Sequence, residues 1–183
     1  MFAYSQPMML GAGDGRTLSA AGQWTGLTAN YTFSGDDIAP TAGNSHIKTV
    51  HTFAGDFDLK FTMTALGNST GFGFYLSAND AEFSESDATL ADAAGVSANA
   101  GSFYINNDGA SVRCEVADAL EGTITPSNGD VIVLRRVGTA VTIEINSTTA
   151  FTFSSTSTGT VRIFITSFGT TLDFDDVSWS GGA

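Results

Sequence analysis

Hydrophobic and polar residues alternate along most of the chain after about residue 20. The clearest run is 57–65, FDLKFTMTA, in which Phe57, Leu59 and Phe61 alternate with Asp58 and Lys60. A period of two places the apolar side chains on one face of a strand and the polar side chains on the other. The run therefore predicts an antiparallel strand with one face in a core and the other in water.

The same alternation recurs in many short segments separated by turn residues. It is found at 27–33, 72–76, 103–105, 112–116, 141–145, 151–153 and 161–165, and less cleanly at 47–53 and 131–137. Asp108-Gly109 and Val137-Gly138-Thr139 lie between alternating runs, where such residues favour hairpin turns. The pattern predicts a chain of antiparallel strands joined by tight connections.

The last predicted strand changes phase part-way. Its apolar residues fall at 172 and 174 and then at 177 and 179. Because a shift of one residue turns every side chain to the other face, a β-bulge at Asp175 and Asp176 is the simplest way to keep both pairs in the core.

These strands predict an all-β fold, an antiparallel sandwich of two packed sheets in which the first and last strands are neighbours. A chain of 183 residues is long enough for one such domain, which we place at 21–183. The core is predicted to contain Phe57, Leu59, Phe61, Phe72, Phe74, Ile143, Ile145, Ile163 and Phe174.

Residues 1–20 show no sustained period and carry three glycines, so we interpret them as an N-terminal arm outside the sandwich. Ordering such a segment is costly unless its apolar side chains are buried. We therefore expect an assembly arm that docks on a neighbouring copy or another protein, through Phe2, Tyr4, Met8, Met9 and Leu10. The alternative is that the arm packs on its own domain as an extra edge strand.

The segment 79–100 breaks the strand pattern with acidic residues and many alanines. A short helix over 84–94, capped by Ser84 and ended by Gly95, and a long surface loop both fit it.

Composition limits the partners of the protein. Nineteen acidic residues against seven basic ones give a formal net charge of −12, which disfavours binding to nucleic acid or to an anionic membrane surface. Cys114 is the single cysteine and is in phase with buried valines, so no disulfide within the chain is expected. Residues 1–20 lack a basic stretch followed by an apolar run, and we expect no secretory signal there.

Three segments carry a family resemblance. GDVIVLRRVGTAVTIEINSTTAFTF followed by GTVRIFITSFGTTLDFDDVSW, together with the earlier HIKTVHTFAGDFDLKFTM, resembles the strands of concanavalin A-like (laminin-G-like) jelly-roll domains. The resemblance implies a jelly-roll sandwich. It also implies calcium as a candidate ligand, with Asp173, Asp175 and Asp176 or the 80–92 segment as its oxygen donors; otherwise no cofactor is expected.

Aromatic side chains are candidates for stacking on sugar rings, as in lectins. Tyr75 and Tyr104 are out of phase with their apolar neighbours and are therefore predicted to face outward. Packing against a neighbouring subunit is the other use for them.

The opening YSQPMMLGAG resembles the first residues of tailed-phage structural proteins. It suggests a head-decoration or fibre-type component located in the virion, whose partners are other virion proteins or copies of itself. The alternative function is a lectin-like carbohydrate-binding module that recognises surface glycans.

No catalytic group can be assembled from the sequence, so we predict that the protein is not an enzyme. Glycosidases of the concanavalin A-like superfamily share an E-x-D-x-x-E or similar strand, which places two carboxylates on one face, and this chain has no such run. His46 and His51, the two histidines, are five residues apart and so fall on opposite faces of a strand. A glycan hydrolase is therefore the least favoured interpretation.

Overall fold

The computed structural model of the chain describes residues 16–18, 20–34, 37–64, 70–82, 103–107, 112–116, 119–154, 158–167, 169–170 and 174–181. Within these residues every pair of neighbouring strands is antiparallel. The helices described there are three short 3₁₀ segments, η1 (Ala21–Gln23), η2 (Thr28–Asn30) and η3 (Ser77–Glu82). Nowhere in those ranges is a helix both long and apolar enough to cross a membrane.

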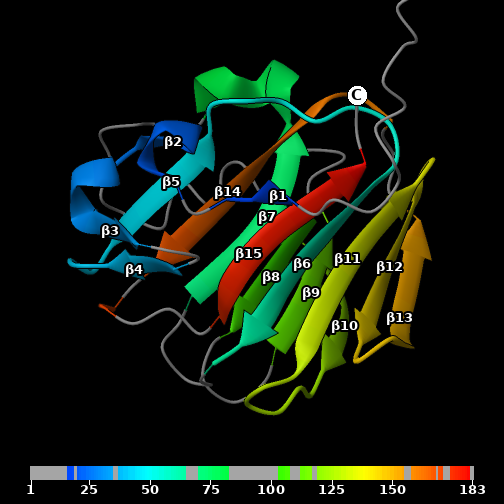
Figure 1. Cartoon of the computed structure of the whole chain (residues 1–183). Coiled ribbons are helices and arrows are strands. Elements are labelled where there is room, and N and C mark those ends of the chain that lie inside the picture. The colour runs from blue at the N-terminus through cyan, green and yellow to red at the C-terminus, as the bar shows by residue number, and fades with distance from the viewer. Residues whose placement is uncertain are drawn as a thin grey trace, which may run out of the picture.

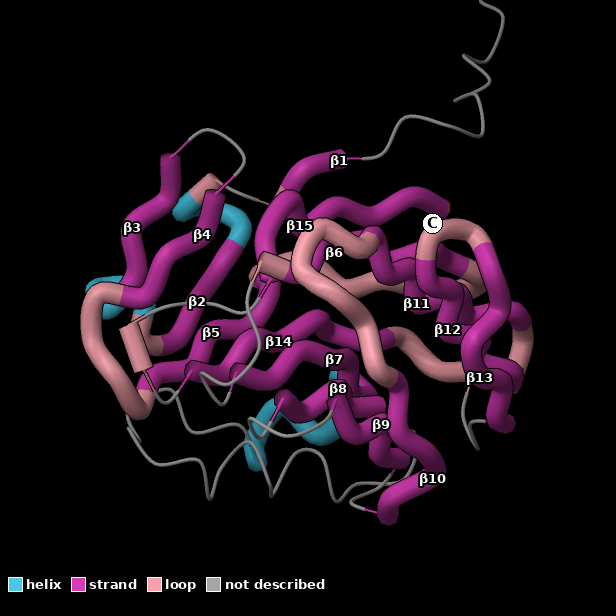
Figure 2. The backbone as a smooth tube through the Cα atoms, turned by 90° about the horizontal axis from the view of Figure 1, so that it is seen from below, coloured by secondary structure: helices cyan, strands magenta, loops and turns pink. Residues whose placement is uncertain are grey.

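The strands form two large sheets that lie face to face, with a small hairpin beside them (Figures 1 and 2). The six-stranded sheet has the order β1 (Arg16–Thr17), β15 (Phe174–Gly181), β6 (Phe57–Met63), β11 (Val131–Val137), β12 (Ala140–Ile145) and β13 (Thr148–Ser154). The seven-stranded sheet has the order β10 (Ala119–Ile124), β9 (Val112–Val116), β8 (Phe103–Asn107), β7 (Thr70–Leu76), β14 (Val161–Ser167), β5 (Ser45–Thr49) and β2 (Trp24–Gly26). The hairpin is formed by β3 (Tyr31–Ser34) and β4 (Asp37–Pro40). The predicted all-β antiparallel sandwich is confirmed.

The core lies between the two sheets and is rich in aromatic rings. Phe57 and Phe61 of β6 meet Phe74 and Phe72 of β7 edge to face, with ring centres 5.5 and 5.0 Å apart. Such contacts add to the stabilisation that burial of these large side chains already gives. Of the predicted core residues whose side chains are described, all are buried except Ile145, which is partly buried at the edge of the core. The side chain of Phe174 is not described. Cys114 is buried, as its phase predicts.

The phase change in the last strand is resolved by a β-bulge, as predicted. Pairing between β15 and β6 is regular up to Asp175 and resumes at Ser178. Asp176 has a φ of 54°, a left-handed conformation that is uncommon for a residue other than glycine. The bulge returns Val177 to the core, where it is 2% exposed.

The first residues described do not follow the predicted boundary at residue 20. Arg16 and Thr17 pair with Trp179 and Ser178 of β15, and the Leu18 side chain is buried in the core. This part of the predicted arm is therefore an edge strand of the sandwich. The first and last described strands, β1 and β15, are neighbours, but the first strand predicted from the sequence, 27–33, corresponds to β3, which pairs with β4. Residues 1–15 lie outside the described residues.

The predicted strand over 27–33 is correct only in its second half. Thr28–Asn30 form η2, and β3 begins at Tyr31. The predicted hairpins are present as antiparallel neighbours, β8 with β9 and β11 with β12. Of the 79–100 segment, the beginning lies in η3 and residues 83–100 lie outside the described ranges, so neither the helix nor the loop is tested.

Candidate functional site

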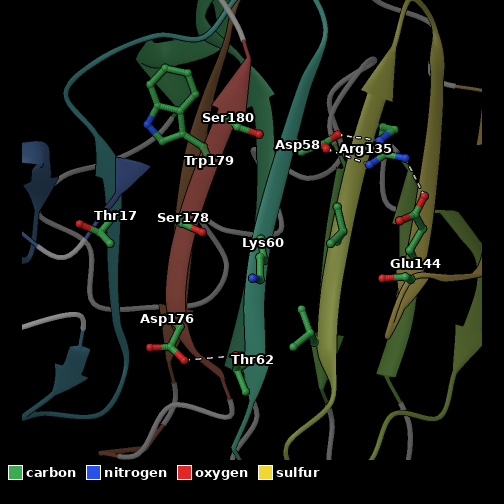
Figure 3. Close-up of a pocket in the computed structure, with 13 residues that line it drawn as sticks. Thr17, Asp58, Lys60, Thr62, Arg135, Glu144, Asp176, Ser178, Trp179 and Ser180 are labelled. Carbon is green, nitrogen blue, oxygen red and sulfur yellow. Dashed lines mark hydrogen bonds and ion pairs between the residues drawn. The ribbon is translucent and has the colours of Figure 1, made fainter. Parts of the chain in front are cut away.

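A groove of about 750 Å³ crosses the outer face of the six-stranded sheet (Figure 3). Side chains that point away from the core form most of its lining, as strand alternation requires. The lining residues belong to β1, β15, β6, β11 and β12 and to the turn after β12. They are Thr17, Asp58, Lys60, Thr62, Val131, Val133, Arg135, Glu144, Ser147, Asp176, Ser178, Trp179 and Ser180.

Strand pairing aligns five of these residues in one row at right angles to the strands. Thr17 pairs with Ser178, Ser178 with Lys60, Lys60 with Val133, and Val133 with Glu144. At the usual spacing between strands this row is roughly 19 Å long. Its middle is the ammonium group of Lys60, which Figure 3 shows over β6 between the flanking strands.

On one side of the groove, Arg135 forms ion pairs with both Asp58 and Glu144. The Arg135 guanidinium donates from Nε and Nη2 to the two carboxylate oxygens of Asp58 at 2.8 and 2.9 Å, and from Nη1 to Glu144 at 2.8 Å. The hydrogen bond and charge of Asp58, helped by the charge of Glu144, raise the pKa of Arg135 against the smaller effect of burial. The guanidinium thus fixes both carboxylates in place through charge-assisted hydrogen bonds.

The other side of the groove ends at the bulge. Thr62 donates a hydrogen bond to Asp176 Oδ2 at 3.2 Å. Asp37 of β4, Asp175 and Asp176 each offer a carboxylate oxygen, and these oxygens lie within 4.8 Å of one another. Burial and the neighbouring carboxylates of Asp37 and Asp176 raise the pKa of Asp175, although the backbone amide of Asp176 counteracts them.

This acidic cluster contains two of the three carboxylates predicted as calcium donors, Asp175 and Asp176. Oxygen donors at these separations suit a hard divalent cation, and exposed carboxylates also gather without one. Asp37 comes from a different strand, β4, and no local pattern indicates that it lies beside Asp175 and Asp176. Asp173 lies outside the described residues.

Tyr75 faces away from the core, as predicted, but the prediction that it is available to a sugar is wrong. Tyr75 lies on the outer face of the seven-stranded sheet, as its phase requires, but its exposed fraction is 0%. Its ring packs against Phe164 with centres 6.0 Å apart, and its hydroxyl donates to Asp80 of η3 at 2.6 Å. That face is therefore covered, which a strand pattern alone does not reveal.

Asp80, which lies in η3, contacts three side chains of the seven-stranded sheet. It accepts the Tyr75 hydroxyl and Arg162 Nε, and Lys48 Nζ lies 3.5 Å from it. Burial opposes ionisation of Asp80, but the hydrogen bonds from Tyr75 and Arg162 and the two positive charges outweigh it, so its pKa lies below the usual range. The cluster is a structural ion pair between η3 and the sheet.

The remaining predicted site residues stay untested. The side chain of Tyr104, on β8, is not described, and Phe2, Tyr4, Met8, Met9 and Leu10 lie outside the described residues. Of the two histidines, His46 is buried and His51 is exposed. Among the described residues that line the groove, Trp179 is the aromatic one. It is half-buried beside Phe53, with ring centres 4.7 Å apart, and lies on the side of β15 away from β6 (Figure 3).

The groove residues Asp58, Lys60, Arg135, Glu144 and Ser178 were not singled out in the sequence. Each occupies an ordinary polar position of an alternating strand, and such positions are usually only solvated. The signal that unites them is the pairing of β6 with both β15 and β11. Those partners are distant in sequence, so the outer face cannot be assembled before the topology is known.

Solved structures with a similar fold were found, whereas no protein-family model and no curated protein matches the sequence. The carbohydrate-binding module CBM66 from Bacillus subtilis is similar over 87% of this chain and 96% of that chain, with a TM-score of 0.58 and 13% identity. The SPRY domain of human HERC1 is similar over 89% of this chain and 91% of that chain, with a TM-score of 0.54 and 10% identity.

A LamA variant from Zobellia galactanivorans, solved in complex with laminaritriose and laminaritetraose, gives a TM-score of 0.55. It is 13% identical over 83% of this chain and 81% of that chain. At such identities the similarity establishes the fold, a jelly-roll sandwich of the concanavalin A-like type. The expected jelly-roll fold is thereby confirmed.

Proposed function

We propose that this protein is a non-catalytic carbohydrate-binding module and that it binds glycans in the groove on its six-stranded sheet. The observation that carries the proposal is the row Thr17–Ser178–Lys60–Val133–Glu144, in which hydroxyl and charged groups surround a small apolar surface. Polyhydroxylated ligands need many hydrogen-bonding groups and some apolar contact, and this lining offers both. Two of the solved structures with this fold are named as a carbohydrate-binding module and as an oligosaccharide complex, which supports the choice.

The absence of catalysis is part of the proposal. A glycosidase needs one carboxyl group that stays protonated to act as the acid. In this groove Asp58 and Glu144 are both held by the Arg135 guanidinium, so neither carboxyl group is placed as an independent acid. Incubation with laminarin and other β-glucans is expected to release no reducing ends. Release that disappears in the Glu144→Gln variant would contradict this part of the proposal.

Binding is tested with an array of labelled glycans, followed by titration calorimetry on those that bind. Val133→Trp places a large ring in the middle of the groove and is expected to abolish binding. Thr152→Trp is the matched control, because Thr152 is exposed on β13 of the same sheet and does not line the groove. If no glycan binds, or if Val133→Trp binds as the wild type does, the groove is not a glycan site.

A virion structural role, which the N-terminal resemblance suggests, receives no support from the comparisons. The arm that would carry it lies outside the described residues. It remains a prediction, together with location in the virion and binding to virion proteins. Deleting residues 2–15 tests it, since assembly should then fail if the arm docks on a partner.

A further inference from the structure

Lys60 differs from the other basic residues whose side chains are described. The chain has seven lysines and arginines. Of those described, Lys48 and Arg162 contact Asp80, Arg135 binds Asp58 and Glu144, and Arg136 is buried. Lys60 is exposed and, within the described part of the chain, has neither an ion pair nor a hydrogen bond from its side chain.

This free ammonium group occupies the middle of the groove. Lys60 pairs with Ser178 on one side and Val133 on the other, and both of these residues line the groove as well. The nearby acidic groups have other partners: Asp58 and Glu144 bind Arg135, and Asp176 accepts a hydrogen bond from Thr62. The three N–H donors of Lys60 are therefore available to a ligand.

A ligand that fills the groove must cover this ammonium group and displace its water. Removing water from a cation is costly unless a strong acceptor replaces it. A carboxylate or a sulfate is such an acceptor, because hydrogen bonds between oppositely charged groups are roughly twice as strong as neutral ones. The hydroxyls of Ser178 and Thr17, next in the row, can donate to the same anionic group or to the sugar beside it.

We infer that the groove prefers acidic glycans, in which a uronate carboxylate or a sulfate ester binds Lys60. The inference rests on the proposed function and adds the class of ligand to it. A protein with a net charge of −12 repels polyanions in general, so binding of an acidic glycan must come from a local cationic site. Non-specific attraction to a basic surface, the usual alternative for polyanion binding, does not operate here.

The test compares acidic polymers with their neutral counterparts by affinity electrophoresis and calorimetry. Polygalacturonate is compared with its methyl ester, and dextran sulfate with dextran. The first comparison tests recognition of a carboxylate and the second tests recognition of a sulfate. We expect at least one acidic polymer to bind about tenfold or more tightly than its neutral counterpart. Lys60→Gln should remove that difference, whereas Lys60→Arg should keep most of it. Lys60 is exposed, so both variants are expected to fold.

Salt gives a second readout. Raising sodium chloride from about 0.05 M to about 0.5 M should weaken binding of the acidic polymer to the wild type and have little effect on Lys60→Gln. Equal binding of acidic and neutral polymers, or undiminished binding by Lys60→Gln, would overturn the inference. If neutral glycans bind and Val133→Trp abolishes that binding, the proposed function holds and only the preference fails. If no polymer of either kind binds, both fail together.

Discussion

The guanidinium of Arg136 lies 4.6 Å from the centre of the Phe57 ring, inside the sandwich. Arg136 is 1% exposed, and its described hydrogen bonds go to backbone carbonyls, two to Gly55 and one to Gly159. Gly55 precedes β6 of one sheet and Gly159 precedes β14 of the other. Burial lowers the pKa of Arg136, and the charge of Asp56 acts against this effect. One buried side chain therefore ties the ends of the two sheets together.

Arg136→Lys should destabilise the protein by about 2 kcal/mol or more. A lysine lacks the planar fork that reaches both carbonyls at once, and an unsatisfied buried carbonyl is costly. The measurement is the free energy of unfolding in urea. Arg135→Lys, at the neighbouring and more exposed position, is the matched control and should cost no more than about 1 kcal/mol. Equal losses for the two variants would show that the buried contacts of Arg136 are not important for stability.

Gly122→Ala should cost about 1–2 kcal/mol, because its methyl group would lie 2.8 Å from the Phe151 ring of the opposite sheet. Replacing the Phe151 ring by the smaller leucine side chain, in the double variant Gly122→Ala/Phe151→Leu, should recover part of this loss. A double-mutant cycle measures that recovery as a coupling energy. Gly22→Ala is the control, since a methyl group there meets nothing within 4 Å. A coupling energy near zero would contradict the packing described at this end of the sandwich.

Asp80→Asn should lower stability at neutral pH by about 1–2 kcal/mol, because it weakens the contacts of Arg162 and Lys48. The value is modest since the Asp80 side chain is 34% exposed and solvent screens it. The pKa of Asp80 is lowered by folding, so its contribution is complete above about pH 4, the usual range for aspartate, and is lost as the pH falls through the folded value. Melting curves from pH 7 to pH 2 should therefore converge for the two proteins. A stability difference between the two proteins that stays constant from pH 7 to pH 2 would show that ionised Asp80 does not stabilise the fold.

Asp175→Asn should have the opposite effect and stabilise the protein slightly at neutral pH. Folding raises the pKa of Asp175, so the wild type carries a penalty that grows as the pH rises from about 4 through the folded value. Removing one charge from the cluster should raise Tm by about 1–2 °C at pH 7 and by nothing at pH 3. The scans are run in EDTA, so that no divalent cation offsets the repulsion. A lower Tm for Asp175→Asn at pH 7 would contradict this view of the cluster.

Local patterns were sufficient to predict many of the strands and part of the core. The alternation in 57–63 predicted β6 and its buried face, and the phase change around Asp175 predicted a bulge before the pairing was known. Both features depend only on which face each side chain must occupy, and that information is present in a few consecutive residues.

The site could not be predicted in the same way. Lys60 and Ser178 lie side by side through the pairing of β6 with β15, and no local pattern specifies that pairing. The burial of Tyr75 could not be predicted either. Its phase correctly placed it on the outer face of the sheet, but the pattern does not show that Asp80 of η3 contacts it there. Arg16–Thr17 were misplaced because two residues are too few to show a period.

The position of β6 has a consequence for biosynthesis. β6 lies between β11 and β15, and β15 is the last strand described. During translation the β11 edge of β6 can therefore pair well before its other edge, which stays open until Phe174–Gly181 leave the ribosome. An open strand edge in a nascent chain invites pairing with other chains. Truncated products that end before residue 174 should consequently aggregate and should lack the β15 wall of the groove, even though most of the core residues have already been made.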